Sequence, residues 1–383
     1  MKKISPKQKY FLIKKSKAGL VKSKSHYTRL ARRSNVSKKK EPHNEPARKK
    51  FLQHLRALPS INIDNDTSER FVFLDPPKDF SLIHNYERTL SFLMELRRHF
   101  STNPEYLNSS REIKAYFASF HKIEKIEPAA GLVLAAEMHR FKQAYGKKPI
   151  SFDHIWKTNV KDFFHEIGLF DLLEIDARSL KEESSEAEPK KTVQIINGSL
   201  AEGSKADLLR ERLQTISGKH ISDHATMYAA ITEAMTNVCN HAYPSRAKFW
   251  PTPQPELWWI TAVWRPLQGK ATILLYDQGV GFPQTLKRRP GYWNAIKAFI
   301  TERTDAAIIA AAMEYGRSGT NKANRGKGLP QMLALTQSTP DSYLRILSGK
   351  GLFVAQSNGK ITKVNNRVPF LGTLVEWEIN LNG

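Results

Sequence analysis

Three polar residues recur at four-residue intervals within one helical stretch: Glu233, Asn237 and His241. Positions i, i+4 and i+8 lie along one face of a helix, which we expect over Thr226–Ala242. The amide oxygen of Asn237 suits Mg²⁺, which prefers hard oxygen ligands. A carboxylate one turn earlier, Glu233, could orient and deprotonate a water. A solvated polar helix face is the alternative, and the pattern alone does not exclude it.

A second group of residues ends a β-rich run. Asp277, Gly279 and Gly281 directly follow Ala271–Tyr276. An Asp at a strand end is placed to accept a hydrogen bond from the amino group of adenine. Glycines at the next alternate positions let the backbone approach a base and adopt positive φ. Such a pair of glycines by itself is more often only a turn.

A third group combines glycine with positive charge before a helix. The segment Arg325-Gly326-Lys327-Gly328-Leu329 precedes a helical run over Pro330–Thr336. Free N–H groups and the dipole at a helix N-terminus favour anions. Lys322, Arg325 and Lys327 add positive charge, so the segment predicts a phosphate cradle.

These motifs, in this order, resemble the ATP site of the GHKL superfamily, named for gyrase, a heat-shock chaperone, histidine kinases and MutL. The resemblance covers residues 193–383 and implies an α/β sandwich of the GHKL type, the Bergerat fold. Gly372-Thr373, which opens the last expected strand, resembles an element whose threonine lies near the base.

The resemblance also implies roles for individual residues. Glu233 would be the general base of the ATP-hydrolysing members, Asn237 the magnesium ligand and Asp277 the adenine contact. The glycine loop would close over the phosphates. His241 is a lesser member of the set, and a plain helix-face histidine is an equal alternative. Mg-ATP is therefore the expected ligand.

Two features of this sequence differ from well-known members of the superfamily. The segment between Gly281 and Gly326 is long, with an Ala-rich helix expected over Thr304–Tyr315 and a flexible turn over Gly316–Gly319. This is where the superfamily keeps its ATP lid, so a mobile lid is expected. The chain also lacks a phosphoacceptor histidine box before Glu233, which disfavours a sensor kinase.

Three functions stay open at this point. The first is an ATPase that hydrolyses Mg-ATP slowly and uses it to change conformation. The second is a serine/threonine protein kinase of the anti-sigma type, since a base can activate a hydroxyl as readily as a water. The third is a nucleotide-gated module that binds nucleic acid or protein without significant catalysis.

Residues 68–180 are expected to form a smaller α/β domain. Ile126–Glu137 resembles the central strand-to-helix turn of STAS domains, and an unrelated α/β domain is the alternative. Signalling members carry a phosphorylated serine just before the glycine, where this chain has Pro128, Ala129 and Ala130. The resemblance therefore implies a docking surface without a phospho-switch. Bacterial switch kinases bind separate STAS proteins, so a regulatory partner is expected, and residues 181–192 form an interdomain linker.

Alternation and helical spacing predict further elements. We expect strands over residues 71–74, 115–126, 193–196, 257–264, 271–276, 343–346, 352–356 and 373–379. Besides the helix over Thr226–Ala242, we expect helices over residues 46–58, 86–100, 131–145, 152–167, 205–216, 304–315 and 330–336.

The charge is concentrated at the start of the chain. Residues 1–50 hold 18 Lys and Arg against two Glu, a charge of +16 out of the total of +23. This tail lacks an amphipathic period and is expected to be disordered. Basic clusters interleaved with aromatics suit DNA or RNA binding through residues 1–45, and a solvated extension is the alternative.

The composition limits the cellular compartment in which we expect this protein. No stretch is apolar enough to span a bilayer, and no membrane partner is expected. The single cysteine, Cys239, excludes an internal disulfide and is expected to be a buried structural thiol. We therefore expect a cytoplasmic protein. Homodimers are common in the superfamily, but the sequence does not show whether this chain forms one.

Overall fold

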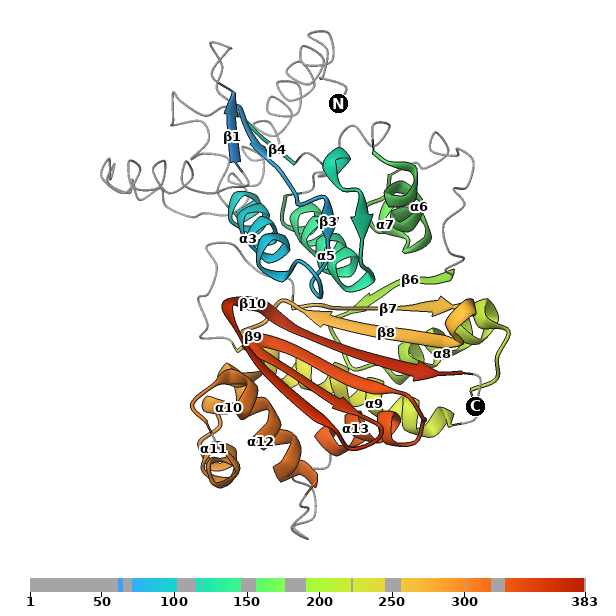
Figure 1. Cartoon of the computed structure of the whole chain (residues 1–383), viewed down its shortest axis with the longest axis vertical. Coiled ribbons are helices and arrows are strands. Elements are labelled where there is room, and N and C mark those ends of the chain that lie inside the picture. The colour runs from blue at the N-terminus through green and yellow to red at the C-terminus, as the bar shows by residue number, and fades with distance from the viewer. Residues whose placement is uncertain are drawn as a thin grey trace, which may run out of the picture. The chain divides into compact units, whose positions relative to one another are not determined.

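The computed structural model describes residues 61–64, 71–101, 115–118, 120–145, 156–175, 191–221, 223–244, 256–300, 302–317 and 328–381. The described residues within 74–103 and 118–381 belong to one compact unit (Figure 1), and those within 61–73 and 115–117 belong to a second one. The described strands β1 (Ile61–Asp64), β2 (Phe71–Leu74) and β4 (Ala115–Ala118) make a three-stranded sheet in the order β1-β2-β4.

A five-stranded antiparallel sheet is the centre of the larger unit. Its order is β6-β7-β8-β10-β9. The bounds are β6 Lys191–Gly198, β7 Trp258–Arg265, β8 Lys270–Asp277, β9 Tyr343–Gln356 and β10 Ile361–Asn380. The predicted mixed α/β class is confirmed at this level.

Local sequence explains the hairpin between β7 and β8. Pro266 begins a short 3-10 turn, and Gly269 ends it in the left-handed region at φ 63°, which costs glycine little. Arg265 then pairs with Lys270, and the register continues to Trp258 opposite Asp277. Asp277 is therefore the last residue of an inner strand.

Both faces of the sheet are buried, with side chains alternating along each strand. In β8, Ala271, Ile273 and Leu275 belong to the main apolar core, whereas Leu274 and Tyr276 point to the opposite face. Because residues of both parities are buried in β7 and β8, the sequences of these two strands are nearly continuous apolar runs.

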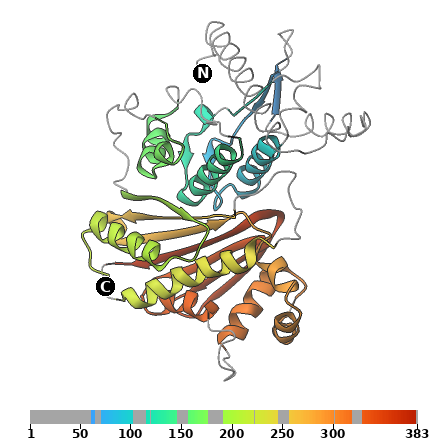
Figure 2. The same cartoon turned by 180° about the vertical axis from the view of Figure 1, so that it is seen from behind.

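Helices from residues 203–337 cover the first face (Figure 2). They are α8 (Gly203–Ser217), α9 (His224–Asn237), α12 (Asp305–Arg317) and α13 (Gly328–Gln337). The α9 helix contacts α8 and α13, and α13 is fixed to the sheet by a bond from Trp377 Nε1 to the Met332 carbonyl at 2.8 Å. Two shorter helices, α10 (Phe282–Lys287) and α11 (Pro290–Ile296), follow β8.

Helices from residues 86–145 cover the second face. The α3 helix (Tyr86–Ser101) contacts β10, and α5 (Pro128–Tyr145) contacts β7 and β8. The α5 helix begins with Pro128, and the Glu127 carboxylate accepts hydrogen bonds from the Ala129 and Ala130 amides. The sheet therefore lies between two helical layers of one compact unit.

The remaining described elements lie beside α3 and α5. The parallel pair β3 (Asp79–Phe80) and β5 (Lys125–Ile126) precedes α3 and α5, and α6 (Thr158–Glu166) and α7 (Leu169–Leu172) contact β6. The expected turn from strand to helix after Ile126 is present. The STAS-like fold of residues 68–180 stays a prediction.

Several expected bounds were wrong. The strand expected over 115–126 is interrupted: β4 ends at Ala118, and a 3-10 turn precedes β5. The two strands expected over 343–356 are one strand, β9, and β10 extends well before residue 373. Lys191 and Thr192 belong to β6 rather than to the linker, and Gly316 and Arg317 continue α12 rather than forming a turn. The helix predicted over 46–58 lies outside the described residues.

Candidate nucleotide site

Two of the three helix-borne polar residues lie on the last turns of α9. Asn237 Nδ2 donates to Glu233 Oε1 at 2.8 Å and approaches Met332 Sδ at 3.9 Å. Because both contacts use the amide nitrogen, the amide oxygen is the atom left to face a metal ion or a water. Burial raises the pKa of Glu233 above its ordinary value, although the bond from Asn237 opposes the shift. A raised pKa makes the carboxylate a better proton acceptor.

The third residue, His241, lies on a π-helical turn, Val238–Ala242, that follows α9. The expectation of one α-helix through Ala242 was therefore wrong, because the wider turn shifts the phase after Asn237. His241 Nε2 lies 3.1 Å from Arg289 Nη1. Burial and the Arg289 charge lower the pKa of His241, which favours a neutral ring that accepts from the guanidinium.

Asp277 is only 3% exposed. Its Oδ1 accepts a hydrogen bond from the Gly279 amide at 2.7 Å. Burial raises the pKa of its carboxyl to about 7, although Gly279, the hydroxyl and amide of Thr373, and the Arg97 charge all act to lower it. A carboxyl in this state stays partly neutral near pH 7 because the ligand-free site solvates its charge poorly.

The two glycines after Asp277 have different reasons to be glycine. Gly281 has φ 86°, as expected for a residue that permits positive φ. A Cβ at Gly279 would lie 2.3 Å from the Ala242 carbonyl oxygen, and the next residue, Val280, donates to that same oxygen at 2.9 Å. Gly279 therefore allows the strand end to meet the π turn, which brings the two motifs together.

Thr373 pairs directly with Asp277 across β10 and β8. Its hydroxyl lies 3.0 Å from Ser348 Oγ, which is itself bonded to the Phe282 amide at 2.8 Å. Gly372 precedes it at φ 96°, and a Cβ there would lie 1.9 Å from the Asp277 carbonyl oxygen. Glycine is thus required for β10 to reach this register beside Asp277.

One cavity of about 640 Å³ is lined by residues of the separate motifs. The predicted residues at its wall are Glu233, Asn237, His241, Asp277, Gly281, Leu329 and Thr373. Gly279 is not among its lining residues. The volume falls within the range of about 300–1,000 Å³ that is typical of small-molecule sites.

The phosphate-cradle motif is only partly described. Lys322, Arg325, Gly326 and Lys327 lie outside the described residues, whereas Gly328 and Leu329 begin α13. The predicted helix after the glycines is therefore confirmed, and the cradle itself stays a prediction.

Arg289 and Tyr292 are among the residues of the cavity wall that sequence reasoning missed. The exposed Arg289 guanidinium lies 5.2 Å from the centre of the Tyr292 ring, and this ring packs on Tyr315 of α12 at 5.3 Å. The available signal was the basic run Lys287-Arg-Arg289 before Pro290, within the segment assigned to the lid.

Cys239 was expected to be buried and is exposed. The π turn rotates it outward, where its Sγ donates to the Ser199 carbonyl at 3.3 Å. It does not line the cavity.

In the described ranges, no group of three or more His, Cys, Asp or Glu side chains is gathered closely enough to hold a metal ion. The donor set at α9, one amide oxygen beside one carboxylate, fits Mg²⁺ only if phosphate oxygens and waters complete its shell. Magnesium accepts such coordination at nucleotide sites.

Comparison with protein-family models and with curated proteins found no match to this chain. Among the described helices, none combines the length and apolarity that a bilayer crossing requires.

Proposed function

We propose that this chain is an ATP-binding protein of the GHKL type that binds Mg-ATP and hydrolyses it slowly to drive a conformational switch. One observation carries the proposal: a single cavity is lined by Glu233 and Asn237 of α9 and by Asp277 and Thr373 of the adjacent strand ends. A hydrogen-bond acceptor for adenine, a candidate proton acceptor and a candidate metal ligand would thus lie in one cavity.

Asp277 is proposed to recognise the base. An adenine amino group donating to its carboxylate would stabilise the ionised form of this buried group. Thr373, whose hydroxyl lies beside Ser348, is placed next to that carboxylate by the strand register. A buried site built around a specific hydrogen bond discriminates strongly against ligands that cannot make it.

Glu233 and Asn237 are proposed to serve the phosphate end. Magnesium, held by the Asn237 oxygen, would neutralise charge on the phosphates. Glu233 would orient a water and take up its proton, a role that its raised pKa favours. Arg289 is an exposed cation at the same wall and is suited to an anionic ligand.

The segment between Gly281 and Gly326, which includes α10 to α12, is proposed as the lid. Arg289, Tyr292 and Tyr315 connect this segment to the cavity wall. Closing it over a nucleotide would exclude water and change the surface that α10–α12 presents to a partner.

The test is a comparison of ATP binding and phosphate release between the full chain and three variants. Asp277→Asn should lose binding, because the amide turns an acceptor into a donor at the base. Its ligand-free melting temperature should not fall, since a neutral group replaces a poorly solvated carboxyl. Glu233→Gln should bind ATP but lose turnover, because it keeps the acceptor for Asn237 without the base.

Cys239→Ser is the matched control, since it alters the same π turn without lining the cavity, and it should behave like the unaltered protein. Undiminished ATP affinity in Asp277→Asn would contradict the assignment. Transfer of labelled γ-phosphate to a protein would identify the kinase alternative. Binding without turnover above the Glu233→Gln level would identify a nucleotide-gated module.

A further inference from the structure

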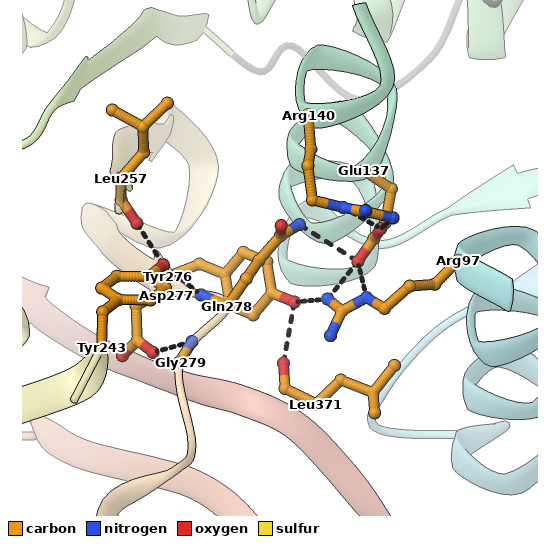
Figure 3. A network of polar contacts seen from close by, with 10 residues as sticks. All are labelled: Arg97, Glu137, Arg140, Tyr243, Leu257, Tyr276, Asp277, Gln278, Gly279 and Leu371. Carbon is orange, nitrogen blue, oxygen red and sulfur yellow. Dashed lines mark hydrogen bonds and ion pairs between the residues drawn. The ribbon is translucent and has the colours of Figure 1, made fainter. Parts of the chain in front are cut away.

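A buried ionic cluster lies on the face of the sheet opposite the cavity core. Glu137 of α5 is completely buried between Arg97 of α3 and Arg140 of α5 (Figure 3). Arg97 Nε donates to Glu137 Oε1 at 2.6 Å, and Arg140 Nη2 lies 2.9 Å from Glu137 Oε2. Burial alone would raise the pKa of Glu137, but the two guanidinium groups hold it below its ordinary value.

The cluster is bonded to both sequence neighbours of Asp277. Arg97 Nη2 donates to the Tyr276 hydroxyl at 2.8 Å, and this hydroxyl donates to the Leu371 carbonyl at 2.8 Å. Gln278 Nε2 donates to Glu137 Oε1 at 3.1 Å. Figure 3 shows both side chains turned toward the cluster, whereas Asp277 lines the cavity.

The backbone of the same segment is also fixed. The Gln278 amide donates to the Tyr243 hydroxyl at 2.9 Å, and this hydroxyl donates to the Leu257 carbonyl at 2.6 Å. The segment from Tyr276 to Gly279 is therefore held by side chains on one face and by backbone bonds on the other.

Such a cluster is a poor way to gain stability. Replacing a buried ion pair with packed apolar side chains is often neutral or stabilising. Buried hydrogen bonds do, however, fix the orientation of the groups that they join. Here those groups are the residues on either side of the proposed base-recognising carboxylate.

We propose that Arg97 and Glu137 are positioning residues for Asp277: by holding Tyr276 and Gln278, they set the selectivity of the cavity for adenine over guanine nucleotides. This inference rests on the proposed function. A carboxylate discriminates between adenine and guanine only if it cannot rotate to accept from differently placed donors. Displacement of such a group by a fraction of an ångström weakens a specific site.

Several charged or titratable groups act on Asp277 from the elements around it. They are Arg97 from α3, Tyr276 from β8 and Tyr243 from the segment after the π turn, together with the Thr373 hydroxyl from β10. The Arg97 charge lowers the pKa of Asp277, so Arg97 has an electrostatic effect in addition to its hydrogen bonds.

The experiment measures ATP and GTP affinity from pH 5.5 to 8.5 with the full chain, in excess magnesium. Tyr276→Phe removes the hydroxyl between Arg97 and Leu371. Its matched control is Tyr86→Phe, which removes a hydroxyl bonded to the Val368 carbonyl at 3.0 Å, also between α3 and β10. Arg97→Met removes the cation and leaves Glu137 paired with Arg140, and Arg97→Lys restores the charge.

Tyr276→Phe should weaken ATP binding by about two- to tenfold, the range for one lost hydrogen bond, with little change for GTP. Tyr86→Phe should change neither. Arg97→Met should move the pH midpoint of ATP affinity upward, and Arg97→Lys should return it toward the original value. If Arg97→Met does not fold, the two tyrosine variants still test whether the cluster positions Asp277.

Unchanged ATP-to-GTP selectivity in Tyr276→Phe would overturn the inference, as would equal effects of the two tyrosine substitutions. A merely structural role would lower the melting temperature without changing selectivity or the pH midpoint. Absence of ATP binding in the unaltered protein would contradict the proposed function itself and this inference with it. ATP binding that all variants share unchanged would contradict the inference alone.

Discussion

Burial raises the pKa of the Asp277 carboxyl to about 7, well above the ordinary range of an aspartic acid. The carboxyl is at the wall of the cavity, and the effect of burial on its pKa outweighs the hydrogen bonds from Gly279 and Thr373. A bound adenine would add one donor and stabilise the ionised form. Under the proposed function, ligand binding and proton uptake at this residue would therefore oppose each other.

The affinity for ATP should accordingly depend on pH. Binding needs the carboxylate, and the bound state has the lower pKa, so affinity is full above about pH 7 and decreases as pH falls below that value. The decrease approaches about tenfold per pH unit once the free carboxyl is mostly protonated. Calorimetric titrations at pH 6 and 8, in excess magnesium to keep the terminal phosphate ionised, measure this. Equal affinities at the two values would contradict it.

At the residue scale, the sequence predicted side chains whose role follows from spacing or from a strand end. Glu233, Asn237 and Asp277 are of this kind, and all three line one cavity. Arg289 could not be predicted, since its place depends on how α10 and α11 fold back after β8. The burial of Arg97 and Glu137 depends on contacts between segments far apart in sequence, and no local pattern indicates it.

At the element scale, the junction between the π turn and the end of β8 holds the two motifs together. It depends on the close approach of Gly279 to the Ala242 carbonyl. Packing of this kind cannot relax without moving either the π turn or Asp277.

Gly279→Ala should therefore destabilise the protein by about 1–3 kcal/mol, the usual cost of overpacking, and weaken ATP binding. Gly291→Ala is the matched control, because a Cβ at Gly291 meets nothing within 4 Å and its φ is not positive. That variant should be neutral or gain up to about 1 kcal/mol within α11. Denaturant unfolding of both variants measures the difference, and equal stabilities would contradict the role of the junction.

Some strands could be predicted from sequence patterns and others could not. Both strands of the hairpin β7–β8 were predicted from continuous apolar runs. The first part of β10 was not, because its side chains over 361–367 are largely exposed and polar, although the backbone pairs with β9. The π turn of Val238–Ala242 has no signature that distinguishes it from an α-helix by spacing alone.

At the scale of the whole molecule, the sheet is covered by helices on both faces, and one layer comes from residues before 146. Residues 191–383 expressed alone should therefore be unstable, because Trp259, Leu274 and Leu374 would be exposed along with other buried residues of that face. A protein of residues 46–383 is the control. Melting of the short fragment at the temperature of that control would contradict the prediction.

The full chain and the protein of residues 46–383 together test the basic tail, whose residues 1–45 lie outside the described part of the chain. If the tail binds nucleic acid, the full chain should bind DNA and RNA with little sequence preference. That affinity should fall steeply between two salt concentrations, as counterion release requires. The protein of residues 46–383 should lose this binding. Equal affinity of both proteins would leave the tail as a solvated extension.

The place of β10 has a consequence for synthesis. This strand lies inside the sheet, between β8 and β9, and carries Thr373 to the side of Asp277. A ribosome makes α9, β8 and α13 before β10, so a nascent chain holds most of the cavity wall while the centre of its sheet is still open. Thr373 can then join the cavity wall only after residues 361–380 have left the exit tunnel. A chain that ends before them would lack Thr373 and leave the facing edges of β8 and β9 without their strand partner.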